Sequence, residues 1–253
     1  MIHFENQSGI ITISIDTNES NSFDLNSFRE LNERLDAAYK ENGKVLILRS
    51  SRPKVFSQGL NLSQLNGEKD ESVLRTFLGY FYEILQKIYF FPAPVIAELG
   101  GHAMGYGAML ALVSDFRYGL ENARIGLPEV KIGIRVPAFI IQLLADVIGK
   151  NEAKEHVLLG DAYKTSEALE IGLLDELYSD PEKLKESVSK FAVKISKNSK
   201  EATAATKEAI RSLSTDLKAT ILLDLEKTFS NLKTKDAIEG VNAAVEGRRP
   251  NFN

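Results

Sequence analysis

Hydrophobic residues follow two different periods along the first part of the chain. Short apolar runs of strand character alternate there with segments whose apolar residues recur every three or four positions, which is the helical spacing. Strands are predicted at about residues 2–16 (two strands around a turn), 44–49, 94–97, 115–120 and 173–178, and residues 55–62 are predicted as a strand that breaks at a glycine. Helices are predicted after residue 24 and at about residues 73–90, 136–148, 152–159 and from 165. A mobile loop is predicted at 66–72, and an irregular connection that contains glycine and proline at 123–130. Strands that alternate with helices predict an α/β fold made of repeated ββα units.

From residue 181 onward the pattern is helical, with almost no strand signal. This segment carries two apolar stripes: Ala202, Ala205, Ala209 and Leu213 form the first, and Ile221, Leu222, Leu225 and Phe229 form the second. Such stripes must be buried, and another subunit is their natural partner. The pattern therefore predicts a core with the functional site over residues 1–180 and a C-terminal helical region, used for oligomerisation, over residues 181–253.

The stretch Glu98–Asp115 is the most informative local pattern. An apolar strand is followed by a turn with glycines at positions 100, 101, 105 and 107, and then by an apolar run of good helix formers. The first N–H groups of such a helix have no partner in the chain and lie at the positive end of its dipole, so they suit an anionic group or a developing oxyanion. The glycine motifs of phosphate-binding loops and of dinucleotide-binding folds are absent. The alternative is that these glycines only allow the helix to pack closely on the strand.

Composition and charge exclude several classes of protein. The formal net charge is −4, so the chain has no electrostatic footprint for nucleic acid. There is no cysteine, which excludes disulfides, thiol nucleophiles and thiolate metal ligands. No apolar run reaches the roughly 18 residues of a membrane span, and no signal peptide is visible. We therefore expect a soluble, cytoplasmic protein without a nucleic-acid or membrane partner.

Two common kinds of catalytic site are also absent from the sequence. The Gly-x-Ser-x-Gly motif of serine hydrolases does not occur. The three histidines, His3, His102 and His156, are scattered and form no His-Glu-x-x-His motif, so no metal site is predicted. His102 is expected to be a turn residue bonded to the backbone.

Three separate segments together offer the groups for a proton transfer. Residues 56–62 offer one backbone N–H after a glycine, and residues 105–107 offer a second at a helix start. Residues 127–130 contain Glu129, beside a proline and among apolar residues, so desolvation is expected to raise the pKa of its carboxyl group. Two donors and one base are the minimum for removing a proton beside a thioester carbonyl, because the donors hold the enolate oxygen while the base moves the proton.

With these segments in this order, the chain resembles the crotonase superfamily, the enoyl-CoA hydratase/isomerase family. The resemblance covers nearly the whole chain, through residues 20–23, 56–62, 101–114, 126–133 and 246–252. It implies a crotonase-type ββα spiral core and a C-terminal helical region that makes trimers, often paired into hexamers. It also implies an acyl-CoA thioester as substrate and no cofactor, since coenzyme A is part of the substrate.

The family's functional residues carry over to matching positions of this chain. Leu60 and Tyr106 match the residues whose backbone N–H groups form the oxyanion hole, and Glu129 matches the main catalytic glutamate. The residues expected to contact the substrate, along the CoA groove or in the acyl pocket, are Ser20, Ser57, Gln58, Gly59, Asn61, Gly105, Met109 and Arg135.

Four positions depart from the family pattern or add to it. Met109 stands where the family's hydratases carry a second glutamate, and Asn61 replaces the usual aspartate. Tyr106 is bulky where glycine is common, but its backbone N–H is the expected donor. Arg135 is a charge near the expected acyl pocket. It is either a surface or subunit-interface residue, or a partner for Glu129 or for an acidic acyl group.

The lack of a second carboxylate at Met109 favours one reaction over the others. A single glutamate can move a proton between two carbons, whereas holding and activating a water is harder, so we expect a Δ3-to-Δ2 enoyl-CoA isomerase. The runner-up is an enoyl-CoA hydratase, or another enolate chemistry such as decarboxylation. From a different class, the protein is a non-catalytic acyl-CoA binder or an assembly subunit. Glu129 beside two donors counts against that, because binding alone needs no base.

Overall fold

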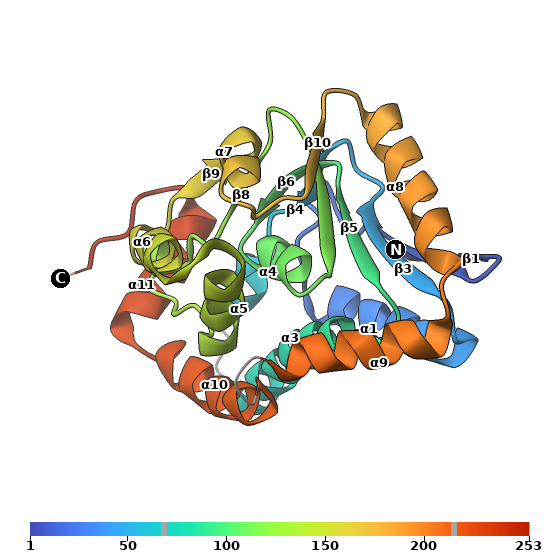
Figure 1. Ribbon diagram of the computed structural model, residues 1–253. Coiled ribbons are helices and arrows are strands. Elements are labelled where there is room, and N and C mark those ends of the chain that lie inside the picture. The colour runs from blue at the N-terminus through green and yellow to red at the C-terminus, as the bar shows by residue number, and fades with distance from the viewer. Residues whose placement is uncertain (67–69, 214–216, 253) are drawn as a thin grey trace.

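A computed structural model describes residues 1–66, 70–213 and 217–252. The strands that the sequence marks with apolar runs form a six-stranded sheet in the order β1-β2-β3-β5-β7-β10 (Figure 1). Its members are β1 (Ile2–Gln7), β2 (Ile10–Ile15), β3 (Val45–Ser50), β5 (Val95–Leu99), β7 (Phe116–Leu120) and β10 (Glu176–Tyr178). β1 and β2 form an antiparallel hairpin, and the other neighbouring pairs are parallel.

Helices cover both faces of this sheet. α1 (Leu25–Glu41), α3 (Glu71–Tyr89) and α4 (Tyr106–Leu112) pack on one side, and α8 (Pro181–Ser196) packs on the other (Figure 1). Successive residues of a strand face opposite ways. On β3, Leu46 and Leu48 therefore join the core below α1 and α3, while Val45 and Ile47 contact the cluster under α8. This is why β3 appears in the sequence as a continuous apolar run rather than as an alternating pattern.

A second sheet lies beside the first and contains three short strands that the sequence did not predict. Its order is β4 (Lys54–Ser57), β6 (Gly101–Met104), β8 (Arg124–Gly126) and β9 (Ala162–Lys164). The predicted glycine turn is wrong for residues 101–104, and the predicted irregular connection after residue 123 is wrong for residues 124–126. A Cβ atom on Gly101 would lie 1.8 Å from the carbonyl carbon of Lys54. This glycine marks a close approach of two strands, not the end of one.

His102 illustrates the same difference. It lies on β6 and not in a turn, but its ring is bonded to the backbone as expected, since Nδ1 accepts the N–H of Arg124 at 3.1 Å.

The remaining elements of residues 1–180 are short. They are α2 (Leu62–Leu65), the 3-10 helix η1 (Glu129–Ile132), α5 (Ala138–Ile148), α6 (Lys150–Leu159) and α7 (Thr165–Glu170). Of the mobile loop predicted at residues 66–72, the last part belongs to α3, which starts at Glu71, and residues 67–69 lie outside the described residues.

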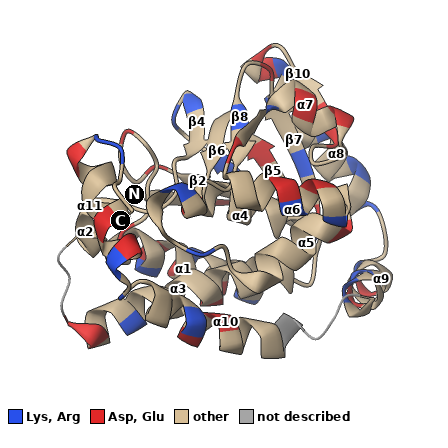
Figure 2. Cartoon of the chain, turned by 90° about the vertical axis from the view of Figure 1, so that its left-hand side faces the viewer, with Lys and Arg blue, Asp and Glu red and all other residues tan. Residues whose placement is uncertain are grey.

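The C-terminal region is helical over its described residues, as predicted. After α8 come α9 (Lys200–Ser212), α10 (Leu217–Asn231) and α11 (Lys235–Glu246). α9 lies at the opposite side of the molecule from α11 (Figure 2). The division of the chain at residue 180 stays a prediction. In the part of the chain that the structure describes, no helix is both long enough and apolar enough to cross a membrane.

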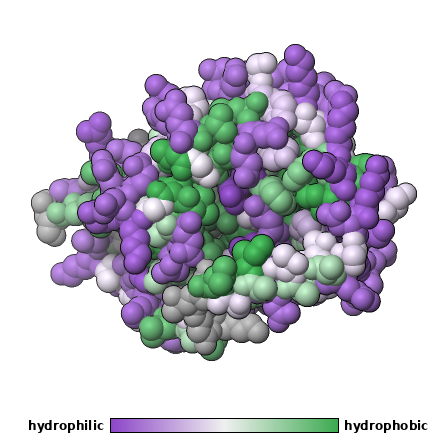
Figure 3. All heavy atoms as spheres, in the orientation of Figure 1, coloured by the Kyte–Doolittle hydropathy of each residue, from purple (hydrophilic) through white to green (hydrophobic). Residues whose placement is uncertain are grey.

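The two apolar stripes of this region have different surroundings. On α10, Ile221 and Phe229 are buried in the core of the same chain, so these positions need no second subunit, while Leu222 is exposed. On α9, Ile210 is 59% exposed and Leu213, just after the helix, is 87% exposed. Apolar side chains are visible on the face along which α9 and α10 run (Figure 3). The predicted subunit contact therefore rests mainly on α9.

Candidate active site

Two glycine-containing loops meet where the parallel strands β4 and β6 end. Gly59 follows β4, and Gly105 follows β6. A Cβ atom on Gly59 would lie 3.0 Å from the carbonyl oxygen of Met104 and 3.2 Å from the amide nitrogen of Tyr106. The φ angle of Gly59 is 96°, in the left-handed region. Glycine allows this approach, which brings the N–H groups of Leu60 and Tyr106 close together. In the described part of the chain, neither N–H group has a hydrogen-bond acceptor.

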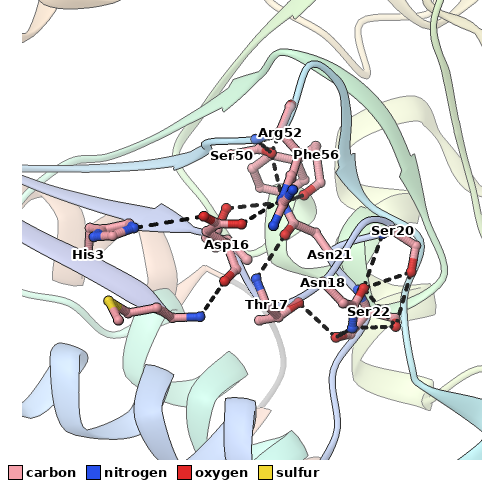
Figure 4. Close-up of polar contacts among 12 residues, drawn as sticks. His3, Asp16, Thr17, Asn18, Ser20, Asn21, Ser22, Ser50, Arg52 and Phe56 are labelled. Carbon is pink, nitrogen blue, oxygen red and sulfur yellow. Dashed lines mark hydrogen bonds and ion pairs between the residues drawn. The ribbon is translucent and has the colours of Figure 1, made fainter.

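The loop that carries Leu60 is held by Asn21, a buried residue to which the sequence assigned no role. The Asn21 amide donates to Ser50 Oγ at 2.7 Å, and the backbone oxygen of Asn21 accepts from Ser57 Oγ at 2.7 Å. Ser57 Oγ accepts in turn from the N–H of Gly59 at 3.1 Å. Figure 4 shows Asn21 within the surrounding cluster of polar side chains. These hydrogen bonds therefore fix the backbone of the loop just before Leu60, and with it the position of the Leu60 N–H.

Asn21 could have been found from its local pattern. It stands between Ser20 and Ser22, shortly after a strand, and has a left-handed φ of 46°. Asparagine tolerates this conformation and bonds to nearby backbone in turns. In the same turn, the backbone oxygen of Ser20 accepts a hydrogen bond from the N–H of Gln58 at 3.0 Å.

The side chain of Tyr106 points away from its N–H group. Its ring packs against the rings of Phe23, Phe28 and Phe81, and its hydroxyl donates to the backbone oxygen of Phe81 at 3.1 Å. Tyr106 is buried within this aromatic cluster. The bulk at this position therefore fills the core and leaves the N–H group free, as expected.

Glu129 approaches the two N–H groups from the start of η1. Its Oε1 lies 3.2 Å from the position that a Cβ atom on Gly105 would take. Glu129 is 8% exposed, and its Oε2 has no hydrogen-bond partner among the described residues. Burial raises the pKa of the Glu129 carboxyl from 4.5 to about 7. The predicted raised pKa is confirmed, and a carboxyl group with this pKa can both accept and return a proton near neutral pH.

Two helices hold η1 and thus the backbone of Glu129. A Cβ atom on Gly240 of α11 would lie 2.0 Å from the carbonyl oxygen of Ile132. A Cβ atom on Gly160, at the end of α6, would lie 2.8 Å from Cγ2 of Val130. Contacts this close leave η1 little freedom to shift. The C-terminal region therefore contributes to the position of Glu129 through α11.

A cavity of about 240 Å³ opens beside these groups. Eight of the predicted site residues line it: Gln58, Gly59, Leu60, Gly105, Tyr106, Met109, Glu129 and Arg135. Most of the other lining residues are apolar, among them Leu62, Leu65, Phe77, Leu78, Phe81, Ile132, Ile134 and Leu232. Glu129 is the one acidic residue among the described residues that line the cavity.

Three predicted site residues do not line this cavity. They are Ser20, Ser57 and Asn61, which lie behind the loop and bond to its backbone or to neighbouring segments. Their predicted contact with coenzyme A stays a prediction. Among the described residues, no three histidine, aspartate or glutamate side chains come together as metal ligands.

Arg135 has a partner that the sequence did not predict. Its Nη1 donates to Oδ1 of Asp224 on α10 at 2.8 Å. The alternative in which Arg135 pairs with Glu129 is therefore wrong. Its side chain is 25% exposed and lines the cavity, so it is not a plain surface residue either. Contact with an acyl group stays a prediction.

Comparison with known proteins agrees with this geometry. The sequence model of the enoyl-CoA hydratase/isomerase family matches residues 5–253. A Bacillus subtilis protein named "Probable enoyl-CoA hydratase" is 27% identical over 248 residues, which cover 96% of this chain and 95% of that protein. The crystal structure of an enoyl-CoA hydratase from Bacillus halodurans has a TM-score of 0.89 at 25% identity, covering 96% of this chain and 99% of the other. That of human mitochondrial Δ3-Δ2-enoyl-CoA isomerase has a TM-score of 0.87 at 23% identity, covering 97% of both chains. The structural matches confirm the predicted fold class.

Proposed function

The chain belongs to the enoyl-CoA hydratase/isomerase family, and we propose that it converts 3-enoyl-CoA thioesters into 2-enoyl-CoA thioesters. The N–H groups of Leu60 and Tyr106 bind the thioester oxygen. The ionised carboxylate of Glu129 removes a proton from C2, and the negative charge moves onto that oxygen as an enolate. Glu129, now protonated, gives its proton to C4 while the double bond forms between C2 and C3. One proton leaves C2 and one reaches C4, so no further reactant is consumed.

The electrostatics of the two donors supply much of the rate in this proposal. Backbone N–H groups fixed in advance stabilise the enolate more than the neutral thioester, and losing one such donor costs about 2.7–4 kcal/mol in comparable sites. The pKa of Glu129, raised to about 7 by burial, lies close to the working pH. That is the value at which one group transfers protons in both directions efficiently.

One observation carries the choice of reaction. Glu129 is the one carboxylate among the described lining residues, and the apolar, buried Met109 lines the same cavity. A buried water needs two to four polar partners. The N–H groups of Leu60 and Tyr106 are engaged by the thioester oxygen, and Met109 adds no second polar group beside Glu129. The proton transfer between carbons needs no water. A non-catalytic acyl-CoA binder would have no use for an unpartnered carboxylate whose burial is costly.

Hydration is the second candidate, because the relatives named above include hydratases. A panel of matched 2-enoyl, 3-enoyl and carboxylated acyl-CoA thioesters, with product identification by mass spectrometry, separates the candidates. Isomerisation leaves the mass unchanged, hydration adds a water, and decarboxylation removes carbon dioxide. We expect conversion of the 3-enoyl thioester and none of the corresponding free acid. Rapid hydration of the 2-enoyl thioester, with the 3-enoyl thioester left unchanged, would exclude the isomerase.

We also expect the chain to assemble into trimers or hexamers. The exposed apolar residues Ile210 and Leu213 support this proposal. So does the firm attachment of α9, since Lys207 and Arg211 each bond to Asp115 at 2.6 Å. Light scattering at micromolar concentration should give three or six subunits. A clean monomer would contradict the proposal.

A further inference from the structure

The lining of the cavity has a second polar part, which we call the arginine wall and define as the side chains of Arg135 and Thr228. Both residues line the cavity, whereas their bonding partners Asp224 and Tyr82 do not, so these partners lie behind them. Arg135 Nη1 also approaches Thr228 Oγ1 at 3.3 Å. The wall is thus a connected network in a mainly apolar lining, whose other polar side chains among the described residues are Gln58, Glu129 and Lys131, the last of which is paired with Asp161.

Both carboxylate oxygens of Asp224 already accept a hydrogen bond from within the protein. Asp224 is 1% exposed, and its Oδ1 accepts from Arg135 while its Oδ2 accepts from the N–H of Phe139 at 2.9 Å. Phe139 lies in the first turn of α5, and Pro137, the residue that precedes this helix, gives it no side-chain cap. Asp224 therefore caps α5 and neutralises Arg135 at the same time.

The hydrogen-bond inventory shows what the wall offers to a ligand. Tyr82 is buried, and its hydroxyl shares a hydrogen bond of 2.7 Å with Thr228 Oγ1, in which either oxygen can be the donor. Thr228 Oγ1 also accepts from Arg135 Nη1 at 3.3 Å, so when Tyr82 donates to the same oxygen, the hydroxyl proton of Thr228 is left for a ligand. The Nε and Nη2 groups of Arg135 have no acceptor in the described part of the chain. The wall therefore presents the N–H groups at Nε and Nη2 of Arg135 as its free donors.

Charge decides which acceptor fits. Asp224 already balances the charge of Arg135 at 2.8 Å. A second carboxylate at the same guanidinium would meet that buried aspartate as a like charge, in surroundings where repulsion is stronger than in water. The free groups of Arg135 are donors only, so a ketone, which accepts and does not donate, suits them better than a hydroxyl group. A keto oxygen accepts two hydrogen bonds and carries no charge.

We propose that Arg135 and Thr228 select acyl-CoA thioesters whose acyl chain carries a keto oxygen beyond the carbons that react. This inference rests on the proposed function for the presence of an acyl chain in the cavity. It assigns a substrate class to the same site: an oxo-acyl thioester, held at its thioester oxygen by Leu60 and Tyr106 and at its keto oxygen by the arginine wall.

The test uses saturated thioesters, which cannot react, so that binding is measured apart from catalysis. Calorimetry on the full chain would compare hexanoyl-CoA, its 4-oxo and 5-oxo derivatives, and adipoyl-CoA, which carries a carboxylate. At least one oxo derivative should bind about tenfold or more tightly than hexanoyl-CoA, the typical effect of a hydrogen bond from a charged donor. Equal or tighter binding of hexanoyl-CoA, or tightest binding of adipoyl-CoA, would overturn the inference.

Variants assign the preference to the wall. Thr228→Val removes the hydroxyl but keeps the shape, so it should lower the affinity for the oxo derivative severalfold relative to the affinity for hexanoyl-CoA. Thr228→Ser should restore the preference. Arg75→Gln is the matched control. Arg75, on α3, bonds at 2.9 Å to Glu226, which lies on the same helix as Thr228, but Arg75 does not line the cavity. An unchanged preference in Thr228→Val, or an equal loss in the control, would contradict the assignment.

The outcomes distinguish this inference from the proposed reaction. Equal binding of all four thioesters, together with isomerisation of a 3-enoyl-CoA, would overturn the substrate class alone. A clear oxo preference without any isomerisation would overturn the reaction alone.

Discussion

The two polar parts of the cavity lining are built in different ways. At the glycine loops, residues 58–60 and 105–107, the donors are backbone N–H groups placed by the adjacent strands β4 and β6. At the arginine wall they are side chains, and Arg135 is 89 residues from its partner Asp224 in the sequence. A backbone donor survives almost any substitution at its own position, whereas a side-chain donor is lost in one step. We infer that the loops fix the chemistry and that the wall sets the choice of substrate.

This comparison predicts different kinds of effect. Changes at the glycine loops or at Glu129 should lower the turnover of every thioester by a similar factor. Changes at the wall should alter the ratio between substrates.

Glu129→Gln should have the largest effect. It keeps the shape of the side chain but removes the base, so turnover should fall by about 10²–10⁴, the range for a positioned acid–base group. Acyl-CoA binding should be largely retained. In the wild type, kcat/KM should rise as the pH increases through about 7, because burial raises the pKa of Glu129 to that value and the ionised form is the base. Steady-state kinetics across this pH range would measure both effects, and unchanged turnover in the variant would place the chemistry elsewhere.

Gly107→Ala should disturb the loops without touching a catalytic side chain. A Cβ atom there would lie 2.4 Å from the carbonyl oxygen of Ser57, so α4 must move away from β4 and take the N–H of Tyr106 with it. Loss of one donor should lower kcat by about 10²–10³ for all thioesters alike. Gly79→Ala in α3 is the control, because nothing lies within 4 Å of its added Cβ atom. The control should retain full activity, and a substrate-selective loss in Gly107→Ala would break the division of roles.

Glu129→Gln should also stabilise the protein at high pH. The pKa of Glu129 is about 7 in the folded state against 4.5 for the model group, so the folded state binds the proton more tightly. The stability that Glu129 contributes is fully present below pH 4.5 and is lost as the pH rises through about 7. At pH 8 the variant should therefore unfold with a free energy higher than wild type by up to about 3 kcal/mol, and at pH 4 with nearly the same value. Urea unfolding at both values measures this, and a variant less stable than wild type at pH 8 would contradict it.

The sequence predicted the parts of the site that lie in short, continuous segments. The loop at residues 58–60, the helix start at Tyr106 and the raised pKa of Glu129 each follow from a few neighbouring residues. The central strands β3 and β5 of the larger sheet were predictable for the same reason, since both of their faces are buried and their apolar runs are continuous.

The parts that the sequence missed depend on contacts between distant segments. Strand β6 was read as a turn because its glycine is required by the neighbouring backbone of Lys54, which the local pattern does not contain. The partner of Arg135 lies on α10, and no spacing rule connects the two positions. Asn21 stabilises the first loop through bonds to Ser50 and Ser57, which come from other strands. The apolar stripe on α10 was assigned to another subunit although part of it completes the core of its own chain.

Met109→Glu should have the smallest effect on rate. It places a second carboxyl group in the cavity and should raise the hydration of a 2-enoyl-CoA, but by no more than about tenfold, because a buried carboxyl beside Glu129 tends to stay protonated. It should also lower stability, since a polar group replaces a buried thioether. Met109→Leu is the control and should leave hydration unchanged. If Met109→Glu and Met109→Leu hydrate at the same rate, Met109 is not what limits hydration.

The central claim is that one carboxylate and two backbone donors move a proton between carbons without a bound water. Its most direct test is the absorbance of the conjugated thioester, followed with wild-type protein and matched concentrations of a 3-enoyl-CoA and a 2-enoyl-CoA. Isomerisation produces this chromophore and hydration destroys it, so the two reactions change the signal in opposite directions. We predict a fast rise with the 3-enoyl thioester and a slow fall with the 2-enoyl thioester. A fall as fast as the rise, or faster, would contradict the isomerase account.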